Sequence, residues 1–143
     1  MARKAPAQAE GHFDQALKLA PRDYPALLRM AQCQHAMGRS QAARRYVLQA
    51  REAYPGEAQA MKLSATLRLG LRDPAGALAE LEAFERVLPG DPGIVFLKGV
   101  AFEGMGRRQA AGQQFASFLR LNPAGESARY ATERLKSWGM LPR

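Results

Sequence analysis

The sequence is poor in the residues that form disulfides and bind metals. Its 143 residues include one cysteine and two histidines. The single Cys33 excludes an internal disulfide, and its place beside apolar positions of an expected helix favours a small buried side chain over a reactive thiol. His12 and His35 are too few and too far apart to form a metal site with Cys33. We therefore expect no metal site and no cofactor.

Motifs of catalysis are missing too. The chain has no His-Glu-x-x-His, no phosphate-binding glycine loop and no Gly-x-Ser-x-Gly. The stretch 104–106 (Gly-Met-Gly) resembles part of a glycine loop, but it ends an expected helix, and its glycines serve the turn. We expect no catalytic residues and no enzyme activity within this chain.

Long apolar segments are also absent. No run of 18 apolar residues is present, so we expect no membrane span. Residues 1–8 are basic and polar, and the apolar core of a secretory signal does not follow them. This pattern leaves the compartment unknown, with the cytoplasm as the default and the periplasm as the alternative if the chain is a piece of a longer protein.

A period of 34 residues organises what is present. It is carried by a proline column, a small-residue column twelve residues earlier and an apolar column between them. These columns are Pro21, Pro55, Pro89 and Pro123; Ala9, Ala43, Ala77 and Ala111; and Phe13, Val47, Leu81 and Phe115. Apolar residues recur at helical spacing and no sustained alternation indicates strands, so the period predicts stacked helix pairs.

These columns resemble the tetratricopeptide repeat (TPR), a helix-turn-helix unit. With each repeat counted so that its proline is position 32, small residues stand at position 8 and larger apolar residues at position 4. They are Ala31, Ala65 and Gly99, and Leu27, Met61 and Val95. The resemblance implies an all-α, right-handed solenoid of antiparallel helix pairs, in which small residues let the two helices of a repeat cross closely.

Two features depart from the family pattern. Position 7, usually leucine, holds Met30, Ser64 and Lys98. The turn glycine at position 15 is Gly38 and Gly106, but the middle repeat has Arg72 there. We expect the turn of the middle repeat to be reshaped.

The period divides the chain into segments. We expect a flexible leader (1–8) and then one domain (9–143), made of a half repeat (9–23), three repeats (24–57, 58–91 and 92–125) and a capping helix (126–138). The opening half repeat favours a piece cut from a longer protein, and a native lone capping helix is the alternative.

The resemblance also implies where a partner would bind. The first helix of each TPR lines a concave groove, mainly at positions 2, 5, 9 and 12. The residues expected there are Leu28, Gln32, His35, Lys62, Thr66, Leu69, Phe96, Val100, Glu103, Tyr130 and Arg134. Aromatic residues make good anchors for a peptide or an amphipathic helix, although Phe96 and Tyr130 could equally pack against neighbouring helices.

The function expected from this resemblance is a protein-protein interaction scaffold. One alternative is an accessory TPR segment of a larger protein such as a peptidase. Another follows from the net charge of +8, which is compatible with weak binding of nucleic acid or an acidic partner through Arg-rich helices. The basic residues are interleaved with acidic ones and not with aromatics, so a solvated helix face is favoured and nucleic acid is unlikely. Self-association through the N-terminal half repeat is a further possibility.

Overall fold

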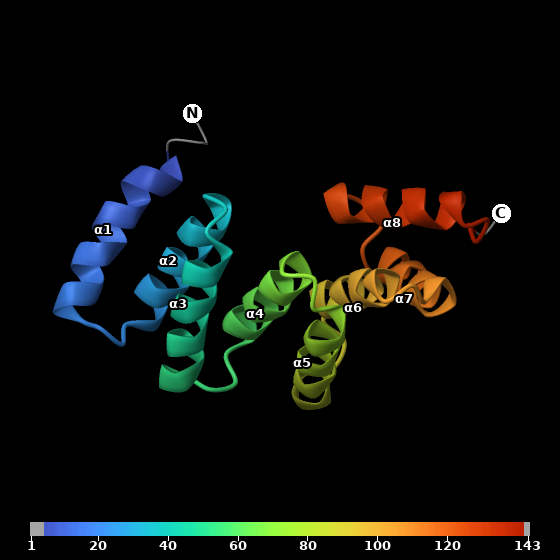
Figure 1. Cartoon of the computed structure of the whole chain (residues 1–143). Helices are drawn as coiled ribbons and strands as arrows, with labels where there is room; N and C mark the ends of the chain where they lie inside the picture. The colour runs from blue at the N-terminus through green and yellow to red at the C-terminus, as the bar shows by residue number, and fades with distance from the viewer. Residues whose placement is uncertain (1–4, 142–143) are drawn as a thin grey trace. The chain divides into compact units, whose positions relative to one another are not determined.

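The protein is all-helical over the residues that its computed structural model describes, 5–141. The eight helices found there are α1 (Ala5–Leu19), α2 (Tyr24–Ala36), α3 (Ser40–Ala53), α4 (Ala58–Gly70), α5 (Pro74–Val87), α6 (Pro92–Gly104), α7 (Arg108–Leu121) and α8 (Glu126–Ser137) (Figure 1). No strand occurs within this range. The all-α architecture expected from the 34-residue period is confirmed.

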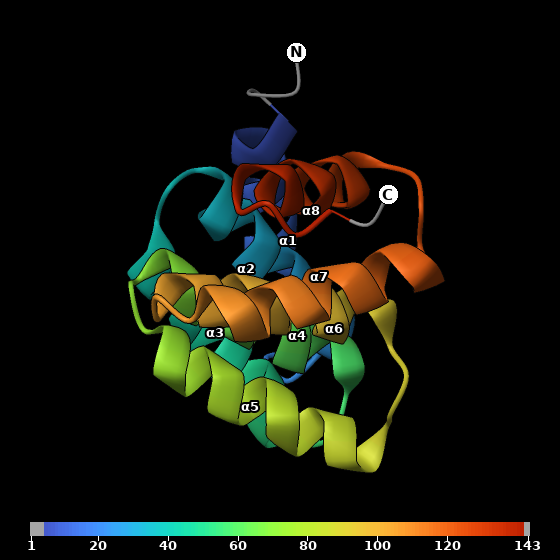
Figure 2. The ribbon, with the colours of Figure 1, turned by 90° about the vertical axis from the view of Figure 1, so that its right-hand side faces the viewer.

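The helices form two compact units, α1–α4 up to Leu71 and α5–α8 from Arg72. In the first unit, consecutive helices pack on one another, and α2 and α3 form the tightest pair. In the second unit α6 and α7 form the corresponding pair, and they lie between α5 and α8 (Figure 1 and Figure 2). Each unit holds apolar core clusters of its own.

The start of the chain differs from the expected leader. Residues 5–8 form the first turn of α1, and residues 1–4 lie outside the described residues. Alanine stands at three of the first five positions of α1, and alanine has the highest intrinsic helix propensity. The helix therefore extends one turn further toward the N-terminus than the repeat columns alone indicate.

Aspartate and proline together start three of the helices. Asp23, Asp73 and Asp91 are the N-caps of α2, α5 and α6, each followed by a proline within two residues. Their carboxylates accept hydrogen bonds from backbone amides of the first turn, at 3.0 Å from Ala26, 3.0 Å from Gly76 and 2.8 Å from Gly93. Such caps satisfy amides that a helix leaves without partners. In contrast, α3 and α7 begin after Arg39 and Arg107, which make no side-chain cap.

The turn of the middle repeat is not reshaped, so that expectation was wrong. Arg72 has a φ of 62°, close to the 78° of Gly38 and the 76° of Gly106 at the same repeat position. An arginine in this left-handed region costs free energy that glycine does not pay, because its Cβ crowds the backbone. The fold accepts this local strain and keeps the turn that ends α2 and α6.

The repeat columns form the core. The alanines of position 20 and the apolar residues of position 24 are 0–1% exposed; they are Ala43, Ala77 and Ala111, and Val47, Leu81 and Phe115. The close crossing is sharpest at Gly99, where an added Cβ would lie 2.5 Å from the ring of Phe115. Small residues at positions 8 and 20 thus allow the close helix contact that the pattern predicts.

The last helix, α8, packs back onto the rest of the second unit. Its buried residues are Ala128, Ala131 and Leu135. The ring of Trp138 stacks on Phe115 with centroids 6.1 Å apart, and Gly139 ends the helix with a φ of 68°. The following Met140 donates its amide to the Leu135 carbonyl at 2.8 Å and packs on the same core. This is the hydrogen bond of a glycine-ended helix terminus, and its usual apolar contact accompanies it.

Candidate partner-binding surface

The eleven residues expected to bind a partner fall into two sets. Six lie on α2 and α4 of the first unit, and five lie on α6 and α8 of the second. The first set is Leu28, Gln32, His35, Lys62, Thr66 and Leu69; the second is Phe96, Val100, Glu103, Tyr130 and Arg134. Each set is assembled within its own unit.

Three members of the second set form a polar cluster between α6 and α8. The hydroxyl of Tyr130 donates to Glu103 Oε1 at 2.6 Å, and Arg134 Nη1 lies 3.4 Å from Glu103 Oε2. The guanidinium carbon of Arg134 also lies 5.3 Å from the centre of the Tyr130 ring. Burial raises the pKa of Tyr130 to about 12, and the hydrogen bond to the Glu103 carboxylate and its negative charge add to this, while Arg134 opposes it. The cluster fixes one face of α8 against α6.

An aromatic cluster continues from these residues into the core. The ring of Phe96 lies 5.1 Å from Phe118, 5.7 Å from Phe115 and 5.8 Å from Tyr130, all measured between centroids. Phe96 is half-buried, whereas Tyr130 remains 37% exposed. Both rings therefore pack against neighbouring helices, and Tyr130 keeps part of its surface for solvent or a partner.

The surface set of the first unit is more varied. Leu28 is 7% exposed and belongs to a core cluster with Leu27, so little of it reaches solvent. Gln32 accepts a hydrogen bond from Arg29 Nη1 at 3.1 Å, and His35 is exposed. Neither α2 nor α4 contains an aspartate or a glutamate. The charged groups of these two helices are therefore all basic.

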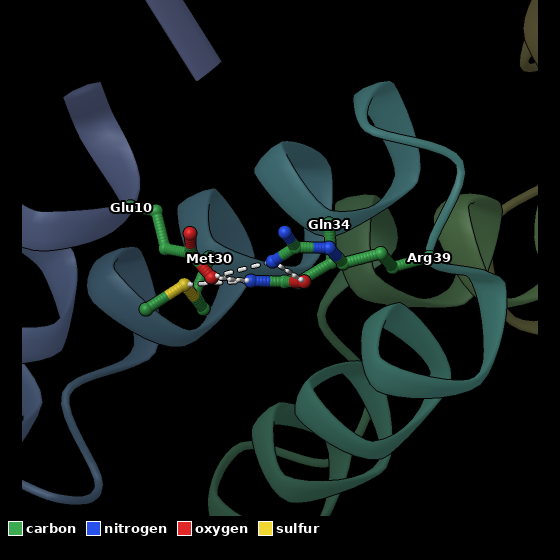
Figure 3. A network of polar contacts seen from close by, with 4 residues as sticks. All are labelled: Glu10, Met30, Gln34 and Arg39. Atoms are coloured by element: carbon green, nitrogen blue, oxygen red, sulfur yellow. Dashed lines mark hydrogen bonds and ion pairs between the residues drawn. The ribbon is translucent and has the colours of Figure 1, made fainter. Parts of the chain in front are cut away.

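A polar network that the sequence did not predict ties α1 to α2. Gln34, only 3% exposed, donates from Nε2 to Glu10 Oε2 at 2.6 Å and lies 3.6 Å from Met30 Sδ (Figure 3). Arg39 Nη1 lies 3.0 Å from the same Glu10 oxygen and 3.4 Å from Gln34 Oε1. The sequence held one sign of this network, a glutamine among the apolar residues of α2, because a buried side-chain amide needs hydrogen-bond partners.

Two of the four arginines between residues 39 and 51 are engaged in contacts within the fold. Arg39 pairs with Glu10, and Arg51 Nη1 lies 3.4 Å from Ser64 Oγ. Arg44 is half-buried and Arg45 is exposed. These contacts favour structural and solvated roles for the arginines over a continuous nucleic-acid surface.

The repeat-column residues of the N-terminal half repeat are less buried than those of the full repeats. Ala9, Phe13 and Ala16 of α1 are half-buried, whereas their counterparts in α3 and α7 are 0–2% exposed. Those counterparts are Ala43, Val47, Ala50, Ala111, Phe115 and Phe118. Self-association through this face of α1 stays a prediction.

Other candidate sites carry little chemistry. Burial raises the pKa of the Cys33 thiol, in keeping with a small buried side chain. Among the described residues, no group of three His, Cys, Asp or Glu could hold a metal ion. A hollow of about 430 Å³ lies on the outward side of α8, where Arg129, Glu133 and Lys136 are exposed, and none of the eleven expected residues lines it. None of the helices described between residues 5 and 141 has the length and apolar character of a membrane span.

Comparisons with known proteins agree with this architecture. A tetratricopeptide-repeat family model matches residues 1–67. A thermophilic TPR protein of Thermus thermophilus is similar in structure, with a TM-score of 0.85 at 22% identity over 97% of this chain and 77% of that one.

Two further structures are similar. MamA of Desulfovibrio magneticus RS-1 gives a TM-score of 0.77 at 18% identity over 97% of this chain and 87% of its own. The APC/C hetero-tetramer Cut9-Hcn1 gives 0.81 at 17% identity over 96% of this chain and 28% of that chain. No curated protein matches the sequence significantly. The chain has the fold of tetratricopeptide-repeat proteins, and its residues 1–67 match the model of that family.

Proposed function

We propose that this protein is an interaction scaffold that binds a segment of another protein along the first helices of its repeats. The TPR fold generally serves protein-protein interaction, and TPR proteins are generally not enzymes. Among similar structures, Cut9-Hcn1 is a hetero-tetramer. For this chain, the partner segment would be an extended peptide or an amphipathic helix.

The ordered surface of α6 and α8 carries this proposal. Glu103 holds the Tyr130 hydroxyl and the Arg134 guanidinium in place, yet Tyr130 is 37% and the Arg134 side chain 41% exposed. An aromatic ring and an arginine are the side chains most often found at binding hot spots. Because both are already fixed, a partner that contacts them loses less side-chain entropy on binding.

The test is site-directed photo-crosslinking in cells of the source organism. p-Benzoyl-phenylalanine replaces Tyr130 in one variant and Tyr54 in a matched control. Tyr54 lies just after α3, is 46% exposed and likewise makes a ring contact, with Tyr24. We expect a discrete adduct with another protein from position 130 that is absent from position 54.

Circular dichroism establishes that both variants keep the helical fold before crosslinking. Adducts of equal yield and identity from both positions would contradict the proposal, because they would indicate random encounters. The absence of any adduct from position 130 in folded protein would contradict it as well.

A further inference from the structure

We infer that the α2–α4 face of the first unit binds an acidic segment in which aliphatic residues alternate with carboxylates. This inference rests on the proposed function, since it names the chemistry of a partner segment. It concerns only the first unit and does not depend on the aromatic surface of α6 and α8.

The distribution of charge gives the first argument. Residues 1–71 hold eleven of the 21 basic residues and five of the 13 acidic ones, a net charge of +6 out of +8. On α2 and α4 every formally charged residue is basic, namely Arg29, Lys62 and Arg68. A surface of one sign attracts and orients a partner of the opposite sign.

Four of the five carboxylates of this unit are engaged or lie on another helix, whereas the charge of Glu57 acts on Tyr24 of α2. Glu10 on α1 is held by Gln34 and Arg39, and Asp14 on the same helix pairs with Lys18 at 3.5 Å. Asp23 accepts the Ala26 amide as the N-cap of α2. The remaining two are Glu52 on α3 and Glu57, the N-cap of α4.

Arg29 is the cation on which the inference depends. It is exposed, and the partner that its guanidinium contacts is the neutral amide oxygen of Gln32, so this contact leaves its charge uncompensated. Lys62 and Arg68 interact with other groups of the protein and are not needed for the argument. Through this contact Arg29 lies beside Gln32, one of the eleven residues expected to bind a partner.

The apolar part of the face selects a peptide over nucleic acid. Leu69 on α4 is half-buried and follows Arg68 in sequence, while the half-buried Leu63 packs in part against the core. Tyr24 at the first turn of α2 is the one phenylalanine, tyrosine or tryptophan on these two helices, and its ring makes an edge contact with Tyr54. Single-stranded nucleic acids need aromatic surfaces on which bases stack, whereas aliphatic surface suits leucine or isoleucine between carboxylates.

Fluorescence anisotropy with the full chain tests this. The probe is a fluorescein-labelled twelve-residue peptide of alternating glutamate and leucine. A peptide with glutamine in place of glutamate and a twelve-nucleotide thymidine strand serve as comparisons. We expect the acidic peptide to bind at least tenfold more tightly than the glutamine peptide at about 100 mM salt.

Two variants of equal charge change locate the site. Arg29→Glu reverses the charge on α2, and Arg45→Glu does the same on the exposed side of α3. We expect Arg29→Glu to weaken binding of the acidic peptide roughly tenfold and Arg45→Glu by less than twofold. Equal losses in the two variants would overturn the inference, because binding would then follow net charge alone.

Two other outcomes also overturn it. One is no binding of the acidic peptide at 1 mM protein, and the other is tight binding of the thymidine strand that depends on Arg29. In either case a specific adduct from position 130 would leave the proposed scaffold function standing. Failure of the scaffold function would instead appear as the loss of that adduct while binding of the acidic peptide persists.

Discussion

Replacement of Lys98 by alanine tests how this fold accommodates its departures from the repeat pattern. Lys98 stands at position 7, where the family usually has leucine, and its side chain is only 13% exposed. Its Nζ lies 2.8 Å from Glu85 Oε1 on α5, and the Glu85 side chain is 30% exposed. Lys98→Ala would therefore leave a largely buried carboxylate without its cation.

The magnitude follows from opposing terms. Two opposite charges 2.8 Å apart attract by roughly 6 kcal/mol at an effective dielectric constant of about 20. Desolvation of both groups offsets most of this attraction, so the net loss is that of a charged hydrogen bond in a partly buried site. We expect Lys98→Ala to lower the free energy of unfolding by about 1–2 kcal/mol.

A double substitution distinguishes the effect of an unpaired charge from the effect of losing the whole ion pair. Glu85→Leu with Lys98→Leu replaces both charges by apolar side chains and restores the family leucine at position 7. Apolar replacement of buried ion pairs is often neutral or stabilising. We expect this double variant to unfold within about 1 kcal/mol of the wild type, whereas each single leucine variant is clearly less stable.

Urea unfolding followed by tryptophan fluorescence measures these changes. Trp138 is the one tryptophan in the chain and stacks on Phe115, so its emission reports the second unit. Lys136→Ala, at an exposed position of α8, is the control for loss of a positive charge. A loss in Lys98→Ala no larger than in this control would refute the reasoning. So would a double variant that loses the sum of the two single losses.

Three further changes probe the local rules of the fold. Arg72→Gly relieves the left-handed backbone and should raise the free energy of unfolding by about 1 kcal/mol in urea titrations; an unchanged or lower value would contradict the strain. Arg107→Asp gives α7 the N-cap that Asp73 gives α5, and should raise the free energy of unfolding of the protein by about 0.5–1 kcal/mol. Arg107→Ala is the control and should raise this free energy by a smaller amount. The raised pKa of Tyr130 means that the folded protein holds this proton more tightly than the unfolded chain does. The stabilisation that Tyr130 provides is therefore fully present below pH 10 and is lost as the pH rises from 10 toward 12. The free energies of unfolding of the wild type and of Tyr130→Phe should depend differently on pH in this range. Identical pH profiles would exclude the Tyr130–Glu103 contact.

Most of the fold could be predicted from the sequence because it repeats. A single proline or alanine predicts little, but a column at a fixed period reports the same packing demand several times. The close crossing at Gly99 is an example, since the small residue and the Phe115 ring it meets both stand in columns. Helix starts at Asp23, Asp73 and Asp91 follow from local chemistry in the same way.

The missed features depend on partners that no column predicts. Glu10 reaches Gln34 across 24 residues, and Tyr130 reaches Glu103 across 27. Repeat positions placed Glu103 and Tyr130 on the same expected surface, but not within hydrogen-bond distance. The turn at Arg72 was misjudged for another reason: the penalty for a left-handed arginine is only about 1 kcal/mol, less than the cost of rebuilding a helix terminus.

The residues at repeat position 7 vary, yet two of them make the same kind of contact with the preceding repeat. Ser64 is contacted by Arg51, and Lys98 by Glu85, and each pair spans 13 residues from one repeat to the next. The residue at position 7 is therefore matched to position 28 of the preceding repeat, not to its own column. Exchanging the partners would set Ser64 against the Glu85 carboxylate and Lys98 against the Arg51 guanidinium. The first exchange removes the cation from Glu85, and the second brings two cations together. The two junctions thus carry pairs that do not interchange, and such specificity is a physical reason for a sequence to give up leucine at this position.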